Sequence, residues 1–408
     1  MRHRTTDTPK GHRNYVIIAC DVLLFLAMLK WLPVEPEVAR GLAVLTFIGI
    51  LWLTEALHVT VTSLLVPVLA MFMGILPGAK ALSGFADPTI FLFFGGFALA
   101  GALHEQKIDT WLAGKILRMA RGRLGVAYSA SIGGMGTLGG SPPNAIAAHE
   151  LGMGFAEWFR IAMPIVLVFG VIVFCLMYLF LRPSLGMHVD MEPEGGEKTE
   201  ARLNARQVRV LILFVLVAGS WMCSSFLSSA LGGIPSMDTL IALSAAVLLP
   251  LCGVINWGGI AKNTDWGVLL LFGGGITLSS ILVQTEAAGF LADQVSSLAM
   301  GQSPIIILLI ISLFITSLTE FCSNTASAAL VAPLMVTVAS AMGMSATPLV
   351  LLVGIGASCA FMLPVSTPPN ALAFATGKFP QMTMVKVGLL INVVLVFVKA
   401  FWAWIFWM

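Results

Sequence analysis

The sequence predicts an all-α membrane protein with about 11 transmembrane helices arranged in two inverted repeats. Its 408 residues are 58% hydrophobic and only 10% charged, whereas a soluble domain carries about 25% charged residues. Apolar runs long enough to cross a bilayer recur from one end of the chain to the other. These observations exclude an ordinary soluble fold, and membrane lipid becomes the expected surrounding of most helices.

One apolar stretch differs from the others because polar residues interrupt it. Its first arm, 304–319, has 16 residues and would be about 24 Å long as a helix, which is shorter than the roughly 30 Å hydrocarbon core. A polar tip and a second apolar arm follow, so 304–343 is predicted to be a re-entrant hairpin with its tip buried near the midplane. The predicted crossings are 15–33, 38–57, 59–76, 88–104, 124–148, 155–182, 207–231, 237–255, 266–284, 347–376 and 382–407.

Basic residues are distributed unevenly among the predicted connections. With the amino terminus inside, 17 Lys and Arg residues fall in inner segments and four in outer segments. An excess of Lys and Arg marks the cytoplasmic side of a membrane protein. The first apolar run is a full span with no cleavage pattern after it, so no signal peptide is expected. We therefore predict a multi-pass protein of the inner (plasma) membrane with a cytoplasmic amino terminus.

The two halves of the chain resemble each other. Residues 86–113 align with 264–292, and 139–148 align with 365–374. In the predicted orientation the first copy of this span runs outside to inside and the second inside to outside, which is typical of secondary transporters. The predicted organisation is a first inverted repeat (1–182), a cytoplasmic linker (183–206) and a second inverted repeat (207–408).

The first repeat is shorter than the second by the length of a hairpin. It spans 48 residues from Gly96 to Asn144, whereas the matched interval that ends at Asn370 spans 96 residues. The hairpin 304–343 lies in the longer interval, and the first repeat has no counterpart near 123/124. Because a hairpin enters and leaves at one face, its absence leaves the orientation unchanged but removes a binding element.

Paired prolines interrupt one predicted span in each half, at 142–143 and 368–369. Proline removes a backbone donor and clashes with the preceding turn, so each pair predicts a discontinuous helix. Carbonyl, hydroxyl and amide oxygens at such breaks suit Na⁺, and the helix N-termini suit a carboxylate. No Lys or Arg lies in the predicted site, so bound sodium and helix dipoles would balance the charge of an anion.

Three motifs together resemble the divalent anion:sodium symporter (DASS) family: Ser-Asn-Thr at 323–325, SPPN at 141–144 and TPPN at 367–370. The resemblance covers about residues 15–407. It implies a bacterial sodium-coupled dicarboxylate transporter that lacks the first re-entrant hairpin and works by elevator-like alternating access as a homodimer. It also implies a small divalent anion as substrate (dicarboxylate, citrate or sulfate), Na⁺ as the coupling ion, and no other cofactor.

The resemblance assigns roles to individual residues. The substrate-binding residues would be Ser323, Asn324, Thr325, Ser141, Thr367 and Pro368. The second sodium site would comprise Thr319, Cys322, Asn324 and Ser366, while Gly140 and Ser131 would retain part of the first site. The remaining motif residues, which shape the two breaks, are Pro142, Pro143, Asn144, Pro369 and Asn370.

Two further features have structural interpretations. Glu320, next to the polar tip, is expected to anchor the hairpin rather than to bind an anion, since like charges repel. The glycines at 95–96 and 273–275 are expected to allow close packing between helices.

Other classes of protein lack support in the sequence. The six cysteines are scattered without a CxxC pair and the six histidines without HExxH, so neither a metal centre nor an enzyme is expected. The basic residues form no patch for nucleic acid, and no ring-like filter sequence suggests a pore. Two alternatives stay open: a sodium-coupled carrier of divalent anions, most simply C4-dicarboxylates such as succinate, and a transport-defective, internally deleted form of it.

Overall fold

The computed structural model describes residues 12–109, 111, 125–181, 203–299, 302–363, 366–375 and 381–408. These residues form helices and contain no strand, which confirms the all-α prediction. The junction near 123/124 and most of the predicted linker 183–206 lie outside the described residues.

The helices follow the predicted spans closely in the first half of the chain. They are α1 (His12–Trp31), α2 (Pro36–Thr54), α3 (Val59–Phe72), α4 (Gly78–Ser83), η1 (Gly84–Ala86), α5 (Pro88–Glu105), α7 (Gly125–Met135), η2 (Leu138–Gly140), α8 (Pro142–Glu150) and α9 (Phe155–Leu181).

The second half is divided into more segments than predicted. Its elements are α10 (Ala205–Met222), α11 (Ser224–Ala230), α12 (Met237–Leu251), α13 (Trp257–Asn263), α14 (Trp266–Gln284), α15 (Ala287–Ala299), α16 (Pro304–Phe321), α17 (Asn324–Ala341), α18 (Ala346–Ala357), α19 (Pro368–Ala375), α20 (Gln381–Trp402) and η3 (Ala403–Trp407). The predicted span 207–231 is two helices, because the chain turns at Cys223.

Nine helices in the described part of the chain are long and apolar enough to cross a membrane, and α3, α12 and α18 are shorter apolar helices. The protein is therefore a multi-pass membrane protein, as predicted. The nine include both arms of the predicted hairpin, α16 and α17, each of 18 residues and so about 27 Å long. The first arm is two residues longer than predicted, because α16 continues through the buried Glu320 to Phe321. The depth of the hairpin tip in the bilayer stays a prediction.

The proline pairs begin the second part of each broken helix. In the first half α7 ends at Met135 and α8 begins at Pro142; in the second half α18 ends at Ala357 and α19 begins at Pro368. Proline suits the first turn of a helix, where the backbone N–H has no intrahelical partner. The predicted spans 124–148 and 347–376 are therefore broken helices, in agreement with the sequence.

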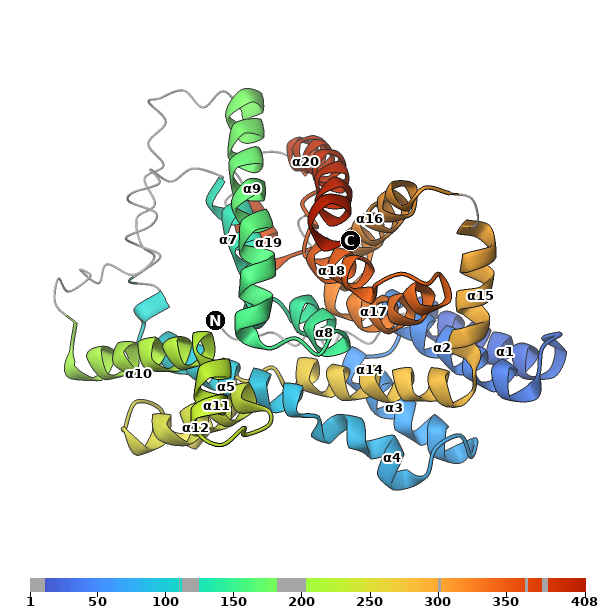
Figure 1. Ribbon diagram of the computed structural model, residues 1–408, viewed down its shortest axis with the longest axis horizontal. Helices are drawn as coiled ribbons and strands as arrows, with labels where there is room; N and C mark the ends of the chain where they lie inside the picture. The colour runs from blue at the N-terminus through green and yellow to red at the C-terminus, as the bar shows by residue number, and fades with distance from the viewer. Residues whose placement is uncertain are drawn as a thin grey trace.

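The helices fall into two groups (Figure 1). One, here called the α5/α14 group, contains α3, α4, α5 and α10 to α14. Its most extensive helix–helix contacts are those of α5 with α12 and of α3 with α14. The other, here the α8/α17 group, contains α7 to α9 and α16 to α20, with α18 packed against α8, α16 and α17. The α14–α17 contact joins the two groups, and α15 packs against both α17 and α14.

Matched positions of the two halves show the same local chemistry in α5 and α14. Asp87 caps α5 by accepting the N–H of Thr89 at 2.8 Å, and Asp265 caps α14 by accepting the N–H of Val268 at 3.1 Å. An aspartate at this position satisfies a donor that the first turn of a helix leaves free.

Glycines permit the closest contacts of these two helices. A Cβ atom on Gly95 would lie 2.4 Å from the carbonyl oxygen of Ala242 on α12, and one on Gly273 would lie 2.4 Å from the ring of Phe85. A Cβ on Gly96 would have no neighbour within 4 Å. The predicted packing role is therefore confirmed for Gly95 and wrong for Gly96.

We expect Gly95→Ala to lower the free energy of unfolding by about 1–3 kcal/mol, because the obstructing atom belongs to the backbone of α12 and cannot rotate away. Gly96→Ala is the matched control, and its stability should be unchanged or slightly higher. Thermal unfolding in detergent measures both, and equal losses in the two variants would contradict the packing described.

Candidate functional site

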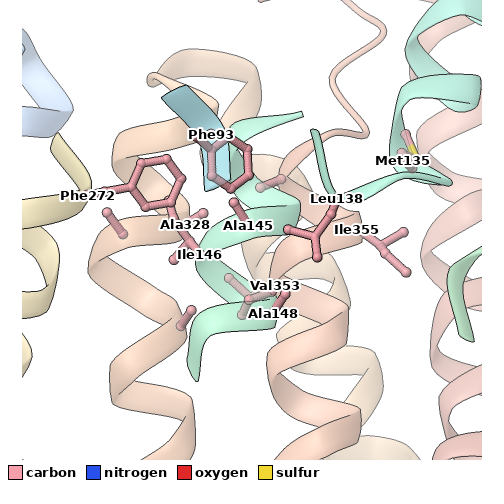
Figure 2. Packing of buried hydrophobic residues seen from close by; sticks show 14 of the residues in the cluster. Phe93, Met135, Leu138, Ala145, Ile146, Ala148, Phe272, Ala328, Val353 and Ile355 are labelled. Atoms are coloured by element: carbon pink, nitrogen blue, oxygen red, sulfur yellow. The ribbon is translucent and has the colours of Figure 1, made fainter. Parts of the chain in front are cut away.

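The helices that begin with the predicted motifs meet in the α8/α17 group. Figure 2 shows Ala145, Ile146 and Ala148 of α8 beside Ala328 of α17 and Val353 of α18. All five side chains are buried. Small side chains let membrane helices approach closely, so the SPPN half-helix of the first half lies directly against the second arm of the hairpin.

The two breaks are also connected to each other. Ser141 of the SPPN motif and Ser358, which ends α18, share a hydrogen bond between their hydroxyl oxygens at 2.8 Å. The hydroxyl of Tyr128 on α7 donates to the carbonyl oxygen of Phe361, in the second break, at 3.2 Å. In addition, α19 packs against α7 while α8 packs against α18. Each half therefore contributes its broken helix to one shared region.

An asparagine closes each break in the same way. Nδ2 of Asn144 donates to the carbonyl oxygens of Gly134 at 3.0 Å and Thr137 at 2.7 Å, which lie ten and seven residues before it. Nδ2 of Asn370 donates to the carbonyls at the same two spacings, at 2.9 Å and 3.1 Å. Both asparagines are fully buried. Unwound backbone inside a membrane protein needs such internal partners, and the PPN motif supplies them.

Glu320 anchors the hairpin tip, as the sequence predicts. Its carboxylate, only 3% exposed, accepts the backbone N–H groups of Phe361 at 2.7 Å and Met362 at 3.0 Å. It also accepts the hydroxyl of Ser366 at 3.1 Å and the side-chain amide of Asn392 on α20. Donors from the protein thus satisfy the buried charge. Glu320 consequently ties the tip to the second break and to α20.

Among the residues predicted for the second sodium site, Asn324 offers an oxygen that could bind a cation. Oδ1 of Asn324 is buried and accepts no hydrogen bond from the described residues. Thr319 is fully buried at the end of the first arm, and Cys322 lies between the two arms. Ser366 reaches this tip from the second break, because its hydroxyl also lies 3.1 Å from the carbonyl oxygen of Glu320. A buried oxygen without a donor is suited to bind Na⁺.

The predicted substrate-binding residues lie at the N-termini of three helices. Ser323 caps α17, its Oγ accepting the N–H of Ala326 at 3.4 Å, and Thr367 Oγ1 accepts the N–H of Asn370 at the start of α19, also at 3.4 Å. Ser141 precedes α8, and Thr325 and Pro368 occupy the first turns of α17 and α19. Helix N-termini favour anions, which is the chemistry expected of these residues.

The two residues predicted for the first sodium site lie at the first break. Gly140 closes η2, where a Cβ atom would lie 2.2 Å from the carbonyl oxygen of Gly134, so this position requires glycine. Ser131 lies on α7, before the same break. The other ligands that the family resemblance implies would belong to the hairpin for which the sequence has no counterpart.

The sequence did not predict a buried lysine next to the hairpin. Lys399 on α20 is fully buried, and its Nζ donates to Oγ1 of Thr316 at 2.6 Å. The hydroxyl of Thr319 donates to the carbonyl oxygen of the same Thr316 at 3.3 Å. A buried amine therefore lies close to the predicted second sodium site. Lys399 was missed because a lysine near the end of an apolar span suggests an interfacial position; its spacing of seven residues from Asn392 places both on one helical face.

Known proteins similar to this chain are transporters. The family described as "Sodium:sulfate symporter transmembrane region" matches residues 114–408, and the one described as "Citrate transporter" matches residues 49–126. An uncharacterized transporter of Haemophilus influenzae is 42% identical over 98% of both chains. An uncharacterized transporter of Methanocaldococcus jannaschii is 32% identical over 88% of this chain and 91% of its own length. A sodium-dependent dicarboxylate transporter of Staphylococcus aureus is 29% identical, over 91% and 87% respectively.

Two of these alignments are longer than the chain itself. The alignment with the Haemophilus influenzae relative extends over 458 positions, compared with the 408 residues of this chain. The alignment with the Staphylococcus aureus relative extends over 456 positions. The chain therefore lacks residues that these relatives possess, in a number comparable to the 48-residue difference between its own halves.

We expect Asn144→Asp to destabilise the protein by about 1–3 kcal/mol, because an ionised carboxylate cannot donate to the carbonyls of the first break. Asn204→Asp is a matched control: Asn204 caps α10 with its oxygen, a role that aspartate fulfils equally well. Thermal unfolding of the two variants in detergent compares them, and equal stability of both with the parent protein would refute the role of Asn144.

Replacing Glu320 by glutamine should cost about 1–3 kcal/mol of stability, since an amide group cannot accept all the donors that converge on the carboxylate. The same change at Glu37, an exposed residue of α2, should have no effect. Thermal unfolding distinguishes the two, and an unchanged midpoint for Glu320→Gln would show that the tip is anchored by other contacts.

Proposed function

Because the chain belongs to the divalent anion:sodium symporter family, we propose that it is a sodium-coupled secondary transporter of a C4-dicarboxylate such as succinate. Sodium is the coupling ion of this family. The choice of a dicarboxylate, rather than citrate or sulfate, rests on the Staphylococcus aureus relative, which is a sodium-dependent dicarboxylate transporter.

One observation carries the proposal: Oδ1 of Asn324, the first residue of α17 after the tip residue Ser323, is buried and accepts no hydrogen bond from the described residues. We propose that the hydroxyl groups of Ser323, Thr325, Thr367 and Ser141, which lie at or next to the N-termini of α17, α19 and α8, complete a site with it. An anion bound there would gain from the adjacent sodium ion, and the sodium ion from the anion. Each ligand therefore raises the affinity for the other, which couples the two bindings.

The arrangement of the two halves supports alternating access between inverted repeats. Helix α7 corresponds to α18, and α8 corresponds to α19, so the α8–α18 contact has its counterpart in the α7–α19 contact. The two asparagines also close their breaks at identical spacings. We further propose that the α8/α17 group is the elevator-like moving part and the α5/α14 group the fixed part of a homodimer. The proposed location is the inner membrane, with the amino terminus in the cytoplasm.

A second candidate function follows from the shortened first repeat: a transport-defective, internally deleted member of the family. The long alignments with full-length relatives favour it. A missing hairpin would remove ligands of the first sodium site and leave neighbouring polar groups unmatched, which is unfavourable in lipid.

We expect the purified chain in proteoliposomes to accumulate labelled succinate under an inward Na⁺ gradient, and Asn324→Ala to reduce uptake by at least about tenfold, since a lost ligand to a charged group is worth roughly 1.5–3 kcal/mol. Asn256→Ala, an exposed cap of α13, is the control. Absence of Na⁺-driven uptake of succinate, citrate and sulfate would contradict the carrier.

A graft separates the two candidate functions. The experiment takes the segment that the Haemophilus influenzae relative possesses and this chain lacks, and inserts it between Arg123 and Leu124. A chain that transports only after this insertion is the transport-defective form. A chain that transports equally well without it is a complete carrier.

A further inference from the structure

A polar cluster lies at the end of α8 that is remote from the SPPN motif. His149 and Glu150 are the last two residues of α8, and Asp87 and Thr89 begin α5. Nδ1 of His149 lies 3.1 Å from the hydroxyl oxygen of Thr89 and 3.4 Å from a carboxylate oxygen of Asp87. The cluster therefore connects the α8/α17 group to the α5/α14 group.

Glu150 is half-buried in this cluster, against a largely apolar wall. With His149 it lines a small cavity whose other walls are Phe272, Gly275 and Ile276 of α14, Ala329 and Pro333 of α17, and Ile146 of α8 itself. The space amounts to about 10 Å³, no more than a single water molecule needs. The carboxyl group of Glu150 accepts no hydrogen bond from the described residues. Burial, and secondly the nearby charge of Asp87, raise the pKa of Glu150 to about 7.

We propose that Glu150, together with Asp87 and His149, forms a proton-binding site that controls the packing of α8 against α5 and α14. A protonated Glu150 is neutral and compatible with the apolar walls. An ionised Glu150 is poorly solvated and repelled by Asp87, so the arrangement in which α8 contacts α14 loses stability. A proton is thereby linked to the position of the helix whose first residues form the SPPN motif.

The charged groups around Glu150 come from few elements. The walls from α14 and α17 are apolar, so α5 contributes Asp87 and α8 contributes His149, whose positive form would offset the charge of Asp87. Two further carboxylates, Glu157 of α9 and Asp238 of α12, contact the segment that follows α8. They accept the backbone N–H groups of Gly154 and Phe155, respectively. Asp87 is therefore the group whose removal should affect Glu150 most directly.

The sign of the pH dependence follows from the direction of the shift. Because the pKa of Glu150 is raised in the packed state, the stabilisation by its proton is complete below the ordinary pKa of 4.5 and is lost as the pH rises through about 7. Acidic conditions should favour the packed arrangement, and neutral to alkaline conditions should favour separation of α8 from α14.

The first test is thermal unfolding of the full chain in detergent between about pH 5 and about pH 8. We expect the midpoint of the parent protein to fall across this range and that of Glu150→Gln to lose most of this decrease. Asp87→Asn should move the decrease to lower pH, a shift that a merely structural role would not produce. Glu157→Gln is the matched control and should retain the parent profile. A parent-like profile for Glu150→Gln would overturn the proposal.

The second test follows the separation of the helices directly and requires no transport, so it can fail independently of the proposed function. Ala329, a buried residue of the cavity wall, is replaced by cysteine in a chain whose native cysteines are serines. The rate of maleimide labelling is compared between the parent and the Glu150→Gln background. The effect of pH on the ionisation of the thiol is common to both backgrounds and cancels in the ratio of the two rates. The parent-to-variant ratio should rise severalfold from about pH 5 to about pH 8. A constant ratio would overturn the proposed link to α8.

Discussion

Backbone groups that are freed where a membrane helix is interrupted must find partners within the protein, because lipid offers none. Backbone is freed in this way between α7 and α8, after Met135, and between α18 and α19, after Ala357, and the third residue of the next half-helix, an asparagine, closes each gap. Glu320 adds a second set of bonds by accepting the free N–H groups of the second break. These bonds supply partners for backbone groups that the breaks free, and the N-termini at the breaks carry the residues of the candidate site.

The electrostatics of the site follow from the same arrangement. Glu320 and Lys399 are both buried in the contact between α16 and α20, each held by polar partners rather than by the other. Three helix N-termini add partial positive charge, and Asn324 offers an oxygen that no donor occupies. We propose that an anion and a sodium ion together suit this environment better than either alone.

Local chemistry could be predicted from the sequence, and long-range contacts could not. The broken helices and the anchoring role of Glu320 follow from proline and from a buried charge at one place in the chain. By contrast, the Ser141–Ser358 bond joins residues 217 positions apart, and Gly95 differs from Gly96 only in facing α12. The length of α16 was underestimated because its last turn is polar and is stabilised by residues of the second break.

We propose that the hairpin tip and the two breaks form one site in which sodium and an anion bind together. Calorimetric titration of the purified chain with succinate, in NaCl and in choline chloride of equal ionic strength, tests it most directly. We expect saturable binding in sodium and none in choline, with an affinity that rises with the sodium concentration. Equal binding in both salts, or no binding in either, would contradict it.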